Sequence, residues 1–237
     1  MSAIANILSF DEIPCLLRGE AGRIDNSIQR CTPGRIILYL AVIVAGAGLF
    51  GGAVGCWRDN LQAVYTALKL PLILLLTTLG NALLNGMLAP LQGLNISFRQ
   101  SLLAILMSFT IASAILGSLS PLLFFLVWNL PPLGAPGGSG AYSFILLLQV
   151  LMIAFAGTAA NLRLVQLLHR LSGSATVARK ILCGWLACNL FLGAQLSWNL
   201  RPFVGSPGLA VQFLRPDAFQ GNFFEGVFNA ARQLFFP

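Results

Sequence analysis

The chain has 237 residues, of which 57% are hydrophobic and only 9% are charged, and its mean hydropathy is +0.82. A soluble protein of this length exposes too much surface to water for so few charges, since soluble domains average about 25% charged residues. This composition excludes an ordinary soluble domain and predicts an all-α bundle of transmembrane helices. The net charge of +7 comes without a basic stripe interleaved with aromatic residues, so no nucleic-acid partner is predicted.

Residues 1–35 are expected to form a cytoplasmic N-terminal segment. Ile4, Ile7 and Leu8 share one helical face, which predicts a short amphipathic helix at the start of the chain. Acidic residues at positions 11 and 12 interrupt this apolar run, so a cleaved secretory signal is not expected.

Five apolar stretches follow, and each is long enough to cross a hydrocarbon core of about 30 Å. They are predicted to form one bundle over residues 36–200, with spans at 36–56, 70–91, 101–129, 141–162 and 181–200. A Pro/Gly-rich linker separates the third span from the fourth, and a basic loop over 163–180 is expected before the fifth. The predicted spans contain no Asp, Glu, His, Lys or Arg.

The first span is rich in glycines that recur every four residues. Gly48 and Gly52 lie on one face, and Gly51 and Gly55 lie on a neighbouring face. Small residues at this spacing allow a second helix to approach closely, so the pattern predicts a helix-packing surface. The neighbour can be another span of this chain or a span of another subunit.

Polar residues form a stripe on the second span. Thr77, Asn81 and Asn85 are spaced four residues apart, and Gln195 and Asn199 repeat this spacing near the end of the fifth span. Because unpaired amides are unfavourable in lipid, these side chains are expected to face other helices. Two interpretations remain open, namely interhelical hydrogen bonding, or a water-lined or substrate-lined path that also uses polar residues at positions 149 and 189.

Residues 201–237 are predicted to form an extracytoplasmic tail. Its first residues, beginning with Arg201 and Pro202, are rich in turn formers, whereas 222–236 has an amphipathic helical pattern. Asn222, three residues before Glu225, is a candidate helix cap. This helix is expected to lie in the membrane interface or on the protein's own spans, and Arg201 and Glu225 are candidates for an ion pair.

The distribution of basic residues predicts the orientation in the membrane. Nine of them fall on the side of the N-terminus, and five fall on the other side. Since cytoplasmic flanks are enriched in Lys and Arg, five spans then give a cytoplasmic N-terminus and an extracytoplasmic C-terminus.

Four short segments carry a resemblance to known proteins. They are Lys69-Leu70-Pro71-Leu72, Phe98-Arg99-Gln100, Leu200-Arg201-Pro202-Phe203-Val204-Gly205-Ser206-Pro207 and Gly221-Asn222-Phe223-Phe224-Glu225. Over most of its length the chain resembles a family of bacterial inner-membrane proteins to which no activity is assigned. Its five-span layout also looks like that of the Yip family, whose eukaryotic members interact with Rab GTPases and act in vesicle traffic. The acidic Asp-Leu-x-Gly-Pro segment of the Yip family is missing here.

The sequence offers no constellation typical of an enzyme. The predicted spans lack ionisable groups for acid–base or metal chemistry, and phosphate-loop and zinc motifs are absent, so neither a cofactor nor a metal is predicted. The favoured function is a non-catalytic scaffold, assembly factor or subunit that binds another membrane protein or a second copy of itself. The alternative is an oligomeric channel or permease for a small solute or ion.

Overall fold

The computed structural model describes residues 12–18, 33–91, 97–205 and 210–225, and within these ranges the chain forms helices and no strand. Its helices are α2 (Glu12–Arg18), α4 (Pro33–Gly55), α5 (Asn60–Leu91), α6 (Phe98–Trp128), α7 (Gly138–Ser172) and α8 (Ala175–Asn199). The five long helices are each long and apolar enough to cross a membrane. The predicted all-α bundle with five spans is therefore confirmed, and its composition is that of a multi-pass membrane protein.

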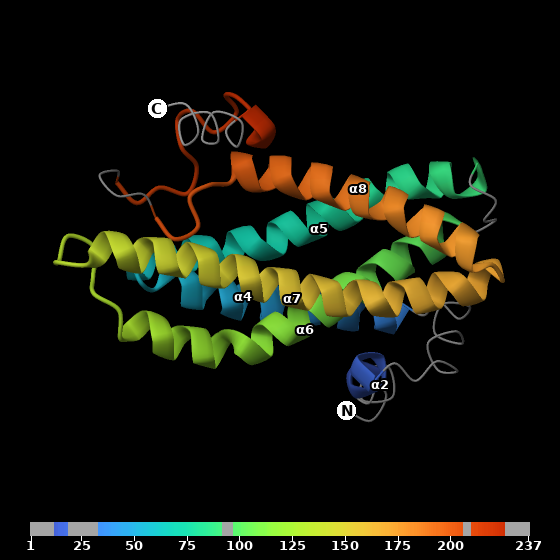
Figure 1. The fold of residues 1–237 in the computed structure, drawn as a ribbon, viewed down its shortest axis with the longest axis horizontal. Helices are drawn as coiled ribbons and strands as arrows, with labels where there is room; N and C mark the ends of the chain where they lie inside the picture. The colour runs from blue at the N-terminus through green and yellow to red at the C-terminus, as the bar shows by residue number, and fades with distance from the viewer. Residues whose placement is uncertain (1–11, 19–32, 92–96, 206–209, 226–237) are drawn as a thin grey trace.

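Consecutive long helices run in opposite directions along the long axis of the molecule, which is horizontal in Figure 1. Helix α4 packs against α5 and α6, α7 packs against α6, and α8 joins α5 to α7. We call the end where α4 begins and α7 meets α8 the basic end, and the end where α8 leads into the tail the tail end. Only 17% of the apolar stretch of α7 and 11% of that of α8 are buried, against 56% for α6, so α7 and α8 are the most peripheral helices and α6 is the most central one.

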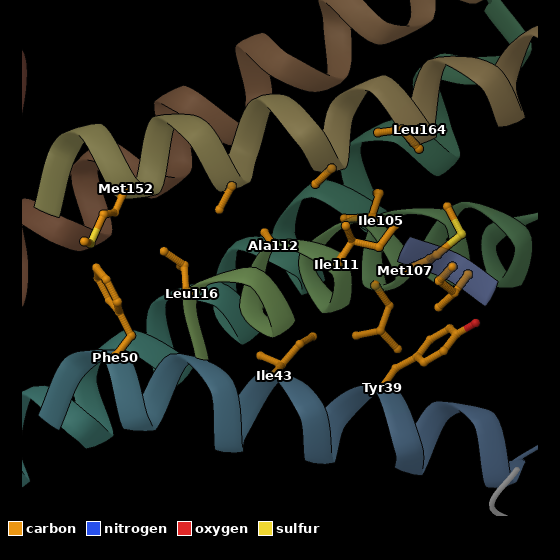
Figure 2. Close-up of a cluster of buried hydrophobic side chains, with 14 of the residues drawn as sticks. Tyr39, Ile43, Phe50, Ile105, Met107, Ile111, Ala112, Leu116, Met152 and Leu164 are labelled. Atoms are coloured by element: carbon orange, nitrogen blue, oxygen red, sulfur yellow. The ribbon is translucent and has the colours of Figure 1, made fainter. Parts of the chain in front are cut away.

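The apolar core lies between α4, α6 and α7. Figure 2 shows Ile43 and Phe50 of α4 pointing toward Ile111 and Leu116 of α6, with Met152 of α7 closing the layer from above. All five side chains are buried. Helix α2 lies beside α6, and its Leu16 also belongs to this core.

Helix α5 begins about three turns earlier than predicted, at Asn60 instead of Leu70. The carboxylate of Asp59 accepts a hydrogen bond from the backbone N–H of Leu61 (2.7 Å), as a helix-capping residue does. The predicted start was wrong because polar residues in these first turns lower the local hydropathy. Lys69 consequently lies within a membrane-spanning helix, where no charged residue was expected.

The predicted basic loop over 163–180 is also wrong. Helix α7 continues to Ser172, because leucines at helical spacing (Leu164, Leu167 and Leu168) are buried against the bundle. Gly173, with φ of +63°, ends α7, and the Ser174 side chain caps α8. Two residues therefore make the whole connection.

Most residues of the two predicted terminal amphipathic helices lie outside the described part of the chain. The predicted N-terminal helix with Ile4, Ile7 and Leu8 lies outside the described residues. The predicted helix over 222–236 is described only as far as Glu225. There Asn222 Oδ1 accepts a hydrogen bond from the backbone N–H of Glu225 (2.8 Å), which is the arrangement expected for a helix N-cap.

Candidate functional site

The glycines of α4 lie on two faces with different surroundings. Gly51 and Gly55 lie directly against the backbone of α5. A Cβ atom on Gly55 would be 2.6 Å from the carbonyl oxygen of Gln62, and one on Gly51 would clash with the carbonyl oxygen of Thr66. These two glycines therefore serve the internal packing of α4 on α5, which only a residue without a side chain permits.

Gly48 and Gly52 instead line a groove on the outer surface of the bundle. A Cβ atom on Gly52 would lie 3.8 Å from the Cβ of Ala67, which is an ordinary van der Waals contact, and one on Gly48 would lie 3.4 Å from the Ala67 carbonyl oxygen. The groove has a volume of about 780 Å³. Its lining comes from α4 (Val44, Ala45, Gly48, Leu49, Gly52, Ala53), α5 (Ala63, Val64, Ala67) and α6 (Gly117, Ser120, Pro121, Phe124).

The polar stripe of α5 faces α8. Asn81 Nδ2 donates hydrogen bonds to Asn189 Oδ1 and to the carbonyl oxygen of Trp185, and Asn85 Nδ2 donates to Asn81 Oδ1. Thr77 is buried next to Gly193 on the same interface. The exposed fractions of Asn81 and Asn85 are 0% and 1%, so no water-sized space borders them in this conformation.

Gln195 and Asn199 do not join that stripe. Gln195 Nε2 donates to Asn199 Oδ1 (3.1 Å), and Gln195 Oε1 accepts from the backbone N–H of Phe223 (3.4 Å). This pair therefore connects the end of α8 to the tail.

In the tail, Arg201 forms an ion pair with Asp217 and not with Glu225, the partner considered from the sequence. The guanidinium of Arg201 bonds Asp217 Oδ2 at 3.1 Å, lies 3.8 Å from the centre of the Trp198 ring and donates to the Trp198 carbonyl oxygen at 2.7 Å. The expected pairing with Glu225 is replaced by this one, and Glu225 contacts Asn222 instead. Pro202 follows a cis peptide bond.

A buried polar cluster on α5, which sequence reasoning missed, binds the tail. Gln62 Nε2 donates to the carbonyl oxygens of Pro202 (3.0 Å) and Phe203 (2.9 Å), and Thr66 Oγ1 donates to the latter at 2.7 Å. Lys69 Nζ donates to the Pro202 carbonyl oxygen at 3.1 Å and lies 5.2 Å from the centre of the Phe213 ring.

A signal for this cluster is present in the sequence. Polar residues recur at helical spacing at positions 62, 66 and 69, and the apolar residues Leu70, Ile73 and Leu74 separate them from the stripe at 77, 81 and 85. The group at 62, 66 and 69 binds the tail, and the group at 77, 81 and 85 faces α8. The side-chain nitrogens of Gln62, Lys69 and Asn81 donate to groups of the tail and of α8, which is an arrangement suited to holding elements together. Gln62 Oε1, Thr77 Oγ1 and Asn85 Oδ1 are buried without a hydrogen-bond partner in the described structure.

The described residues contain no group of three or more His, Cys, Asp or Glu side chains placed to hold a metal ion. No family model, curated protein or solved structure matches the chain. The two family resemblances therefore stay predictions.

Proposed function

We propose that the protein is a non-catalytic subunit or assembly component of a complex in the bacterial inner membrane. In this proposal a transmembrane helix of a partner protein packs into the groove of α4, α5 and α6. The observation that carries the proposal is the open glycine face: Gly48 and Gly52 lie at membrane depth on a surface that no other helix of the described chain covers.

The chemistry of the groove favours a helix over a solute. Its lining is apolar except for Ser120, whose hydroxyl already donates to the carbonyl oxygen of Leu116 at 3.0 Å. The groove thus offers shape and close backbone approach but no free directional partner. Membrane helices associate through this kind of surface, because lipid provides no hydrophobic drive and close packing must supply the attraction.

The polar stripe supports the same structural role. A permeation path would expose the amides of Asn81 and Asn85 to water, yet both are buried. Asn85 donates to Asn81 of its own helix, and Asn81 donates across the α5–α8 interface to Trp185 and Asn189. These bonds link the peripheral helix α8 to the bundle. The proposal includes the orientation expected from the basic residues, with a cytoplasmic N-terminus and an extracytoplasmic tail.

Site-specific photo-crosslinking in native membranes tests the proposal. A photoreactive amino acid replaces Leu49, which lines the groove and is 63% exposed. Gly52→Leu in the same chain fills the groove, since the added side chain extends from a position with room for a Cβ. Gly157→Leu in α7 is the matched control, because no atom lies within 4 Å of a Cβ there.

The expected result is an adduct with one membrane protein that Gly52→Leu reduces at least about tenfold and Gly157→Leu leaves unchanged, as expected when a bulky residue fills a close-packed helix interface. Adducts with lipid alone, or equal losses in both variants, overturn the proposal. An adduct with a second copy of the chain would mean that the partner helix comes from another subunit of a homo-oligomer.

A further inference from the structure

A second cavity lies at the basic end of the bundle, where α7 ends and α8 begins. It has a volume of about 590 Å³ and is lined by Arg163, Val165, Gln166, His169, Arg170, Ala175, Ala178 and Arg179. This volume is in the range of small-molecule sites. We infer that this cavity binds the phosphate-bearing headgroup of an anionic phospholipid.

The short α7–α8 connection brings two cationic elements to one space. Gly173 and Ser174 are the only residues between the helices, so the last turn of α7 and the first turn of α8 border the same cavity. Ser174 Oγ accepts from the backbone N–H of Val177 (3.5 Å), which fixes the start of α8 there. The N-terminus of a helix carries a partial positive charge and attracts anions.

The side chains add to that positive potential. Arg163 and Arg170 approach from α7, and Arg179 approaches from α8. The first turn of α8 contains no acidic residue, and the sequence has no Asp or Glu between positions 60 and 216. Arginine forks match the geometry of phosphate oxygens and bind them with charge-assisted hydrogen bonds. A bound anion would therefore relieve repulsion among basic groups that converge on one cavity.

The position of the cavity favours a lipid over free phosphate. It lies where the apolar stretches of two membrane-spanning helices end, which is the depth of lipid headgroups. A crevice of about 240 Å³ shares Arg163 and Gln166 with the cavity and continues between α6 and α7. Its remaining lining is apolar and consists of Ile111, Ile115, Ala159 and Leu162. A basic cavity joined to an apolar crevice fits a phosphate headgroup with an acyl chain.

Native mass spectrometry of the full chain in mild detergent tests the inference. Three probes are added separately: phosphatidylglycerol, phosphatidylcholine with the same acyl chains, and inorganic phosphate. The test variant is Arg170→Gln/Arg179→Gln, whose side chains are exposed in the cavity. Arg179→Gln alone is also measured, and Lys180→Gln is its matched control, because it removes one positive charge at the next position of α8 and Lys180 does not line the cavity.

The wild type is expected to retain phosphatidylglycerol at least about tenfold better than phosphatidylcholine, since each basic residue near a membrane surface favours anionic lipid. The double variant loses that preference, and Lys180→Gln keeps it. If the double variant does not purify, Arg179→Gln alone must show a reduced preference. Equal retention of the two lipids, equal loss in Lys180→Gln, or displacement of the lipid by millimolar inorganic phosphate overturns the inference.

Discussion

At Gly51, α4 approaches the backbone of α5 too closely for any side chain, whereas one residue later Gly52 has room for a Cβ atom at an ordinary distance from Ala67. Identical residues on one helix thus have opposite roles. Sequence spacing showed that both glycine faces suit close helix contact, but spacing cannot say which face is already occupied. That depends on where α5 packs, which is a tertiary property.

We predict that Gly51→Ala lowers the stability of the protein by about 1–3 kcal/mol, because the added methyl group collides with the carbonyl oxygen of Thr66 and separates α4 from α5. Gly52→Ala is expected to have less than about a quarter of that effect, since its methyl group meets Ala67 at an ordinary distance. Thermal unfolding of the detergent-solubilised variants compares the two. Equal unfolding temperatures would contradict the packing described here.

Lys69 illustrates why hydropathy missed a membrane residue. A window average treats a lysine as a group that must leave the lipid, so the predicted span began just after it. In the structure the amine is buried against the Pro202 carbonyl oxygen and the Phe213 ring, so its partners are protein groups from the tail. Such partners lower the cost of burying a cation, and they come from residues more than a hundred positions away in the chain.

At the scale of elements, the five long apolar helices followed from the sequence, while their ends did not. Apolar runs mark the lipid-facing parts, but α5 and α7 extend beyond those runs as helices whose polar residues contact protein or water. Ser97 and Gln100 form a capping box at the start of α6, and this pattern is present in the sequence. The pattern identifies the helix start only once α6 is known to begin at Phe98.

The hydrogen bonds from Gln62 and Thr66 of α5 to Phe203 indicate how the tail is attached to the bundle. In Gln62→Leu/Thr66→Val the Phe203 carbonyl oxygen loses both side-chain donors, and leaving this part-buried acceptor unsatisfied costs about 1–3 kcal/mol. We expect the backbone amide of Val204, which is buried in the wild type, to exchange with deuterium at least about fivefold faster.

Hydrogen–deuterium exchange of a peptide covering 200–205 measures this effect. Thr158→Val is the control, because the Thr158 hydroxyl is exposed and bonds only within its own helix in the described structure. Wild-type exchange in the double variant would show that the tail is held by other contacts.

At the scale of the whole molecule, charge and shape define two different ends. Arg35, Arg99 and the four basic residues near the α7–α8 turn gather at the basic end. At the tail end, Lys69 is buried and Arg201 is paired with Asp217, so fewer cations there face the membrane surface than the sequence count implies. The excess of basic residues at the basic end that the sequence predicts is therefore kept in the folded protein.

This asymmetry predicts that the α7–α8 turn lies in the cytoplasm and the tail lies outside it. A reporter that is active only in the cytoplasm should work when inserted between Gly173 and Ser174, because these residues form an exposed connection between two helices. The same reporter fused to the C-terminus should be inactive, since α8 crosses the membrane once more. Activity at the C-terminus with none at the turn would mean that the bundle has the opposite orientation in the membrane, with the basic cavity outside the cytoplasm. Activity at both sites would mean that α8 does not cross the membrane.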